Sequence, residues 1–151
     1  MAEKQLHELT PEMMEFLQGE KVIFLSTQDH EEGAPTITCI SWLLAVTPTK
    51  IRFAIDPRSR VIENIAANPR LSLAFIGLES SFAVSGSGSS ELNQLDGVTI
   101  RMTEVNVDVV GVREIMFYGS KIITEPEFEK TYNLDLANKF DAAVYAALGK
   151  A

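Results

Sequence analysis

The chain has 151 residues, a length typical of one domain, and its composition of 46% hydrophobic and 23% charged residues is that of a folded soluble protein. With 13 basic and 21 acidic residues the net charge is −8, which argues against general affinity for nucleic acid or an anionic membrane. No apolar stretch is long enough to cross a bilayer, the N-terminus carries no signal-peptide pattern, and one cysteine suits a reducing compartment, so we expect a cytoplasmic protein.

The N-terminal third predicts one short helix and three strands. Thr10 and Pro11 are typical of a helix start, and Gly19 is suited to its end. The polar residues 29–33 indicate a solvated hairpin tip, and the tight turn at 47–49 favours antiparallel pairing of the strands beside it. The predicted strands are apolar and rich in β-branched residues, and they span 21–27, 35–46 and 51–55.

The middle of the chain predicts a second helix and further strands. The helix spans 59–67, where apolar residues share one face, and Asn68-Pro69 ends it. The stretch 85–90, rich in Gly and Ser, is interpreted as a strand end that runs into a loop. The hydrophobic alternation slips at Thr103-Glu104, which indicates a bulge or a break. The predicted strands span 71–75, 82–87, 98–109 and 115–121.

The C-terminal segment, about 124–149, predicts a third helix. Thr124 and Glu127 match a capping box. An apolar stripe recurs every four residues, at Tyr132, Leu136, Phe140, Val144 and Leu148. This stripe needs an apolar surface to cover, on its own domain or on a partner. The predicted fold is mainly β with flanking helices: one domain, 1–151, built on a six- to seven-stranded antiparallel barrel.

The sequence lacks the residues of several common chemistries. Two histidines and one cysteine cannot form a Cys/His zinc site within one chain, so no metal site is expected. There is no Gly-x-Ser-x-Gly elbow, no Gly-x-x-x-x-Gly-Lys phosphate loop, and no Gly-x-Gly-x-x-Gly before a helix. The usual machinery for ester hydrolysis and for nucleoside triphosphates is therefore not expected.

The point where a strand leads into the second helix is a candidate anion site. A helix start has free N–H groups and a partial positive charge, which attract anions. Ser59 adds a hydroxyl, and Arg58 and Arg60 add guanidinium groups that can hold a phosphate in bidentate fashion. The alternative is that Ser59 only caps the helix, while the arginines are solvated or pair with Asp56 and Glu63.

The run FAIDPRSRVIENIAANPRLSLAF, residues 53–75, resembles the flavin-binding core of the pyridoxamine 5′-phosphate oxidase-like split-barrel family. That core has a strand, a Ser-Arg-Lys or Thr-x-x-Lys element, a helix ending in Asn-Pro, and a further strand. The matching residues are Ser59-Arg60, Asn68-Pro69 and Leu71-Ser72-Leu73, with Gly33-x-Pro35 before them and Phe117-Tyr118-Gly119 after them. The resemblance covers most of residues 10–120 and implies an FMN-binding split β-barrel.

In that family FMN lies at the interface of a homodimer, so the resemblance implies a homodimer with the cofactor at its interface. By position, Ser59 and Arg60 would contact the phosphate, with Arg58 as a helper. Ala54 and Ile55 match positions beside the phosphate and the ribityl chain. The flavin ring would lie largely against the backbone of the second strand, at Thr38, Cys39, Ile40 and Ser41.

Departures from the family pattern argue against pyridoxamine phosphate as the substrate. Val61 stands where the family has a lysine, Thr38 or Cys39 where many oxidases have an arginine, and the C-terminal Arg-Leu-x-Pro element is missing. We expect an FMN-dependent oxidoreductase of unknown substrate, with NAD(P)H as a candidate reductant and no assigned catalytic side chain. The alternative is a flavin carrier or a stress-related flavin-binding protein without turnover.

Other ligands and roles are left open by the sequence. Relatives of this barrel bind haem or a deazaflavin; His7 and His30 are poor candidates for haem ligands, and the residues alone do not separate FMN from a deazaflavin. Cys39 is interpreted as a small buried hydrophobe, because no neighbouring cation in the sequence would activate its thiol. Trp42 would line the ligand cleft or pack in the core or a dimer interface, and Arg70 is expected on the surface.

Overall fold

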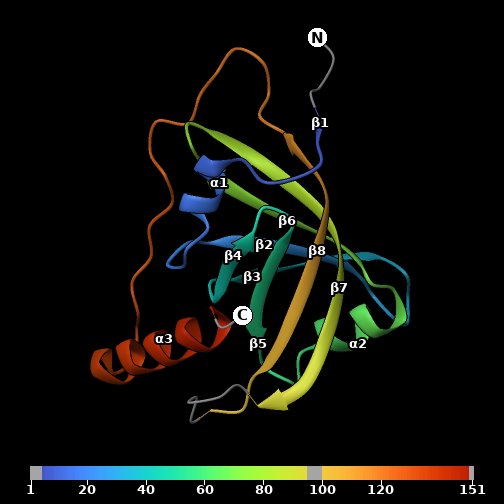
Figure 1. Ribbon diagram of the computed structural model, residues 1–151, viewed down its shortest axis with the longest axis vertical. Coiled ribbons are helices and arrows are strands. Elements are labelled where there is room, and N and C mark those ends of the chain that lie inside the picture. The colour runs from blue at the N-terminus through green and yellow to red at the C-terminus, as the bar shows by residue number, and fades with distance from the viewer. Residues whose placement is uncertain (1–4, 95–99, 150–151) are drawn as a thin grey trace.

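The structure is a computed structural model that describes residues 5–94 and 100–149. The described residues form eight strands and three helices (Figure 1). The strands are β1 (Gln5–Leu6), β2 (Ile23–Gln28), β3 (Pro35–Ile40), β4 (Leu43–Thr47), β5 (Lys50–Ile55), β6 (Arg70–Gly77), β7 (Ser80–Gln94) and β8 (Thr103–Glu114). The helices are α1 (Pro11–Phe16), α2 (Arg60–Ala67) and α3 (Leu134–Leu148).

All eight strands belong to one antiparallel sheet. The strand order is β3-β2-β6-β7-β8-β5-β4, and the short β1 pairs with β8. The two ends of this order, β3 and β4, are consecutive in the chain, so the sheet curls until its edge strands are joined by a short corner. The predicted fold class, a mainly β, antiparallel split barrel with flanking helices, is confirmed.

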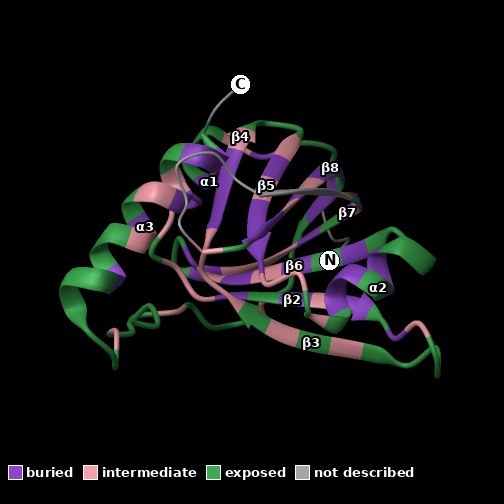
Figure 2. Cartoon of the chain, turned by 90° about the horizontal axis from the view of Figure 1, so that it is seen from below, coloured by how far each residue is buried: buried purple, intermediate pink, exposed green. Residues whose placement is uncertain are grey.

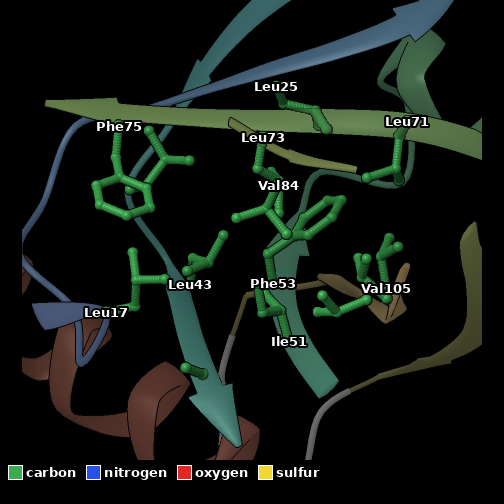
Figure 3. Close-up of a cluster of buried hydrophobic side chains, with 14 of the residues drawn as sticks. Leu17, Leu25, Leu43, Ile51, Phe53, Leu71, Leu73, Phe75, Val84 and Val105 are labelled. Carbon is green, nitrogen blue, oxygen red and sulfur yellow. The ribbon is translucent and has the colours of Figure 1, made fainter. Parts of the chain in front are cut away.

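The core fills the inside of the curled sheet. Figure 3 shows side chains from opposite parts of the sheet pointing toward one another, with Phe53 from β5 facing Val84 from β7. Phe53, Phe75 and Val84 are almost completely buried, and Phe16 and Phe82 stack on the two sides of Phe75. The period-two alternation predicted for β5 places its apolar residues in this core, where removal from water stabilises the fold.

The edge strand β3 is the least covered part of the sheet. Figure 2 shows it at the margin of the barrel, coloured as exposed and half-buried, whereas β5 is buried. Ile37 is 72% exposed, and Cys39 is exposed beside Phe24 of β2. The interpretation of Cys39 as a buried hydrophobe is therefore wrong, because its face of β3 is not covered within the chain.

The strand predicted at 35–46 is two strands. The chain leaves the sheet at Ser41 and Trp42, and β4 then pairs with β5 through the predicted turn at 47–49. The apolar run in the sequence continues across Ser41 and Trp42, because both β3 and β4 contribute residues to apolar clusters. Periodicity alone does not show that the chain crosses from one sheet edge to the other at this point.

The Gly/Ser-rich stretch 85–90 lies inside the long strand β7, so the strand predicted at 82–87 continues, and the interpretation of the stretch as a strand end that runs into a loop is wrong. β7 pairs along its length with β8, and the register shifts between Ser85 and Gly86. A Cβ on Gly86 would lie 2.6 Å from Val107 Cγ1 and 2.7 Å from Asp108 O. The absence of a side chain at Gly86 therefore lets β7 and β8 approach closely, which is one of the reasons why glycine occurs inside strands.

The chain after β8 also differs from prediction. Residues 115–133 form no helix or strand and run outside the sheet toward α3, so the strand predicted at 115–121 is wrong (Figure 1). β8 begins at Thr103, where the alternation slips; of the strand predicted at 98–109, residues 98–99 lie outside the described part. The third helix begins at Leu134 with Asn133 as its cap, so Thr124 and Glu127 do not form the predicted capping box.

Helix α3 covers the outside of the barrel near β4 and β5. Its residues Val144 and Leu148 pack with Leu44, Ala54 and Met102 in a second apolar cluster. The C-terminal half of the predicted stripe therefore covers the chain's own barrel, while Tyr132 and Leu136 remain exposed. Among the described helices, none has the length and apolar character needed to span a membrane.

Candidate functional site

The start of α2 is built as its sequence predicts. β5 ends at Ile55, and a short turn leads to Ser59, whose Oγ accepts a hydrogen bond from the Val61 N–H at 3.2 Å. Val61 and Ile65 are buried, which holds the helix against the barrel, while Arg60 and Glu63 of its first turn are exposed. The predicted helix and its serine cap are both confirmed.

Arg58 is paired with the acid two residues before it. Its guanidinium donates to Asp56 Oδ1 at 3.1 Å and to Asp56 Oδ2 at 2.8 Å. These side-chain bonds, together with the Arg58 N–H, lower the pKa of Asp56 to about 2. The Arg58 side chain is 89% exposed, so this pair is a surface contact that stabilises little.

Arg60 is held by an acid from the β2–β3 turn. Its Nη2 and Nε donate to Asp29 Oδ1 at 2.7 Å and 3.2 Å. Asp29 also accepts from the N–H groups of Glu31 and Glu32 and is largely buried. The Glu32 N–H and the Arg60 guanidinium lower the pKa of Asp29 to about 2. The prediction of a solvated turn is wrong for Asp29, and Arg60 pairs with it rather than with Asp56 or Glu63.

A hydrogen-bonded chain ties α2 to the first hairpin. Buried Asn64 accepts from both the N–H and the Nδ1 of His30, at 2.9 Å and 2.8 Å, and donates to Thr27 Oγ1 at 3.0 Å. Thr27 in turn contacts Thr36 of β3, with 3.2 Å between the two hydroxyl oxygens. Glu63 lies 3.0 Å from His30 Nε2. Asn64, in the middle of α2, is therefore linked through Thr27 to Thr36 in the first half of β3, and the start of the helix is tied to the β2–β3 turn by the Arg60–Asp29 pair.

The predicted ring-binding residues lie along the other half of β3. Thr38 and Ile40 are half-buried on the side of Leu25 and Ile23, whereas Cys39 is on the outer side. A small cavity of about 180 Å³ is lined by Val22, Cys39, Ile40, Ser41 and Phe128. Three of the four predicted residues thus share one cavity, and Thr38 lies just before it.

Ala54 and Ile55 are placed differently from the other predicted site residues. Ile55 belongs to the main core, and Ala54 packs in the second cluster under α3. Both are buried, so their side chains face the protein interior and only their backbone is near the turn into α2. Their predicted place beside a ribityl chain is not tested by this arrangement.

A larger cavity, of about 760 Å³, lies elsewhere. Arg70, which is exposed as expected, lines it with Gln28, Asn68 and the serines of β6 and β7. Within the described ranges, no three His, Cys, Asp or Glu side chains gather closely enough to hold a metal ion.

The site can attract an anion at the start of α2. Arg58, Ser59 and Arg60 are consecutive residues there, and each guanidinium is bonded to a carboxylate, Arg58 to Asp56 and Arg60 to Asp29. Guanidinium, hydroxyl and helix-start N–H groups are donors that bind phosphate and carboxylate groups. Sequence reasoning missed Asp29, His30 and Asn64, because their partners are 31 to 34 residues away in the chain. No local pattern marks contacts of that range.

The fold is similar to several solved structures. A candidate pyridoxamine 5′-phosphate oxidase from Lactobacillus delbrueckii has a TM-score of 0.64 and 16% identity, covering 74% of this chain and 98% of that one. An F420 reductase has a TM-score of 0.53 and 16% identity, covering 65% and 93%. General stress protein 26 from Bacillus anthracis has a TM-score of 0.53 and 16% identity, covering 66% and 87%. At this identity the likeness concerns the fold.

The sequence itself carries a family match. No curated protein matches the chain. The sequence model described as pyridoxamine 5′-phosphate oxidase matches residues 9–110, about two thirds of the chain. This region contains β2 to β7, α2 and most of β8, so it includes both the start of α2 and the edge strand β3. The chain therefore belongs to the pyridoxamine 5′-phosphate oxidase family.

Proposed function

We propose that this protein binds FMN at the interface of a homodimer and acts as a flavin-dependent oxidoreductase. The observation that carries the proposal is the position of Arg58, Ser59 and Arg60 at the start of α2, where Arg60 is bonded to Asp29 of the turn that leads into the edge strand β3. Family membership supports it. Pyridoxamine phosphate is not proposed as the substrate, because Thr38 or Cys39 stands where many oxidases have an arginine and the C-terminal Arg-Leu-x-Pro element is missing.

The donors at the start of α2 fit a terminal phosphate. Asp29 engages Nε and Nη2 of Arg60, and a guanidinium has further N–H groups for phosphate oxygens. The same carboxylate fixes the position of this side chain, so less conformational freedom is lost when a ligand binds. Ser59 Oγ and the exposed Arg58 side chain add donors on the adjoining surface.

The edge strand β3 fits the rest of an elongated cofactor. Thr36 lies at the α2 end of the strand, and Ser41 is five residues further on, roughly 17 Å in an extended strand. Because β3 is at the end of the strand order and pairs with β2 alone among the described strands, the backbone groups on its other side are available to the polar edge of a ring. When bound, FMN supplies hydride or electron transfer, and the residues of this chain bind and orient it.

The binding proposal is tested with Ser59→Ala and Arg60→Ala. Each removes donors to the phosphate, and the loss of charge-assisted bonds of about 1.5–3 kcal/mol weakens binding on the order of ten- to a hundredfold. The dissociation constant is measured from flavin fluorescence on titration with FMN. Lys121→Ala removes an exposed cation outside the site and should bind like wild type. Unchanged affinity in both site variants contradicts the phosphate site.

A flavin carrier without turnover is the second candidate. The favouring observation is that Thr38 or Cys39 stands where many oxidases have an arginine. Anaerobic mixing of the loaded protein with NADH or NADPH separates the two: fast bleaching supports the oxidoreductase, and persistent colour supports the carrier. The absorption spectrum and mass of the ligand distinguish FMN from a deazaflavin, since one structure of similar fold is an F420 reductase.

A further inference from the structure

The corner between β3 and β4 consists of Ser41 and Trp42. These two residues carry the chain from one edge strand of the sheet to the other. The Leu43 N–H donates to Ser41 O, and the Ala54 N–H donates to Trp42 O, both at 2.9 Å. The corner directly follows Cys39 and Ile40, where the proposed flavin ring lies. Its position therefore sets how the second half of β3 is presented to a ligand.

Two side chains of α3 hold this corner. Tyr145 Oη donates to Ser41 O at 3.0 Å and accepts from the Glu20 N–H at 3.0 Å. Asp141 Oδ1 accepts from Trp42 Nε1 at 2.7 Å and from Lys130 Nζ at 3.1 Å. Each of the two corner residues is thus bonded by one side chain from a helix about a hundred residues later in the chain.

The polar contacts at the corner are mostly shielded from water. Asp141 is 7% exposed, and the Lys130 side chain is 18% exposed. Burial raises the pKa of Tyr145 to about 12, so the phenol keeps the proton that it donates to Ser41 O. A shielded ion pair adds little net stability, because desolvation offsets the attraction.

Other side chains of the same helix attach α3 to the barrel. Val144 and Leu148 are fully buried against the barrel, and their apolar contacts hold the helix in place. Asp141 and Tyr145 add directional bonds aimed at two particular residues. Directional polar contacts select one geometry where apolar packing tolerates several.

We infer that Asp141 and Tyr145 are positioning residues for the flavin-binding strand: they fix the β3–β4 corner and with it the backbone of residues 39–41. This inference rests on the proposed function. Helix α3 lies outside the family match of residues 9–110, so the device belongs to the chain's own C-terminal segment. Loss of the bonds from Asp141 and Tyr145 would change the position of the flavin ring, but it would leave the phosphate donors at the start of α2 in place.

The test compares Tyr145→Phe, which removes one oxygen atom, with Lys139→Ala, an exposed position of the same helix. Tyr145→Phe should raise the dissociation constant for FMN about three- to tenfold, the value of one hydrogen bond. It should also change the visible circular dichroism of the bound flavin. Lys139→Ala should match wild type in both measurements. The second variant, Asp141→Asn, removes the charge that Lys130 and the Trp42 indole contact.

Trp42 supplies a readout that needs no cofactor, because it is the only tryptophan of the chain. Its emission without flavin should shift in Asp141→Asn and stay unchanged in Lys139→Ala. Folded variants that show wild-type affinity and circular dichroism overturn the positioning role and leave the proposed function standing. A wild-type protein that binds no FMN overturns both, and the Trp42 emission then shows separately whether α3 fixes the corner. Loss of a cooperative thermal transition in Tyr145→Phe also overturns the role, because the contact then serves folding.

Discussion

At the scale of single residues, Asp29 joins the first hairpin to the start of α2. One carboxylate oxygen accepts from Arg60, and the other accepts from the N–H groups of Glu31 and Glu32. The acid therefore orders the turn and holds the guanidinium of the proposed phosphate site at the same time. A change at this residue affects both stability and ligand binding.

The low pKa of Asp29 makes its contribution to stability depend on pH. Its folded value is about 2, below the ordinary 3.8, so the unfolded chain binds the proton more tightly than the folded protein. The contribution is fully present above about pH 4 and is lost as the pH falls toward 2. Asp29→Asn should lower the Tm at pH 7, and its Tm should fall less than that of wild type between pH 4 and 2.

Thermal unfolding across this pH range measures the effect. Glu129→Gln, which removes an exposed acid outside the turn, is the control and should keep the wild-type dependence on pH. Asp56 also has a pKa of about 2, so part of the acid sensitivity remains in the Asp29 variant. An Asp29→Asn protein that loses stability as steeply as wild type contradicts the assignment.

Site residues whose partners are close in the sequence could be predicted, and those whose partners are distant in the sequence could not. Ser59 was predicted as a cap because its role depends on residues within one helical turn. The partner of Arg60 was not predicted, because Asp29 is brought to it only when the β2–β3 hairpin folds beside α2. The bonds of Tyr145 and Asp141 to the corner were not predicted. The sequence of the C-terminal helix shows an apolar stripe, and such a stripe indicates packing against a surface and no particular hydrogen-bond partner.

At the scale of elements, periodicity predicted the strands with one-sided burial, and tertiary contacts decided where strands end. β2, β5 and β6 lie close to their predicted bounds because buried and more exposed residues largely alternate along each, and α2 does because its apolar residues share one face. The corner at Ser41 and Trp42 was missed, because the chain changes sheet edge within a continuous apolar run. The full length of β7 was not predicted, because a run of glycine and serine is typical of a loop, whereas at Gly86 the absence of a side chain is what the close approach of β8 requires.

Gly86 gives the most direct test of that requirement. Gly86→Ala places a methyl group against Val107 and the backbone oxygen of Asp108, which cannot move aside as a flexible side chain can. Overpacking of this kind costs about 1–3 kcal/mol, and for a chain of this length the Tm falls by about 2–4 °C for each kcal/mol. Ser89→Ala, at an exposed position of the same strand, is the control and should stay within about 1 °C. Equal Tm values for the two variants contradict the close approach of β7 and β8.

At the scale of the whole molecule, apolar side chains remain uncovered on the outside of the barrel. Ile37 on β3 is 72% exposed, and Tyr118 in the segment 115–133 is 91% exposed. The same segment also exposes Phe117 and Ile123. A chain that leaves large apolar groups in water gains by burying them against another surface. A second copy of the chain is the partner that the proposed function requires.

Ile37→Asp tests whether β3 forms part of that interface. A charge placed in an apolar contact costs about 1–3 kcal/mol, so association of two copies should weaken about 5- to 150-fold. Sedimentation velocity over a dilution series measures this, with Thr49→Asp at the exposed β4–β5 turn as the control for added charge. Because the proposed cofactor site lies on the same strand, FMN affinity should fall with dimerisation and depend on protein concentration. A monomeric Ile37→Asp protein that binds FMN as tightly as wild type shows instead that one copy holds the cofactor alone.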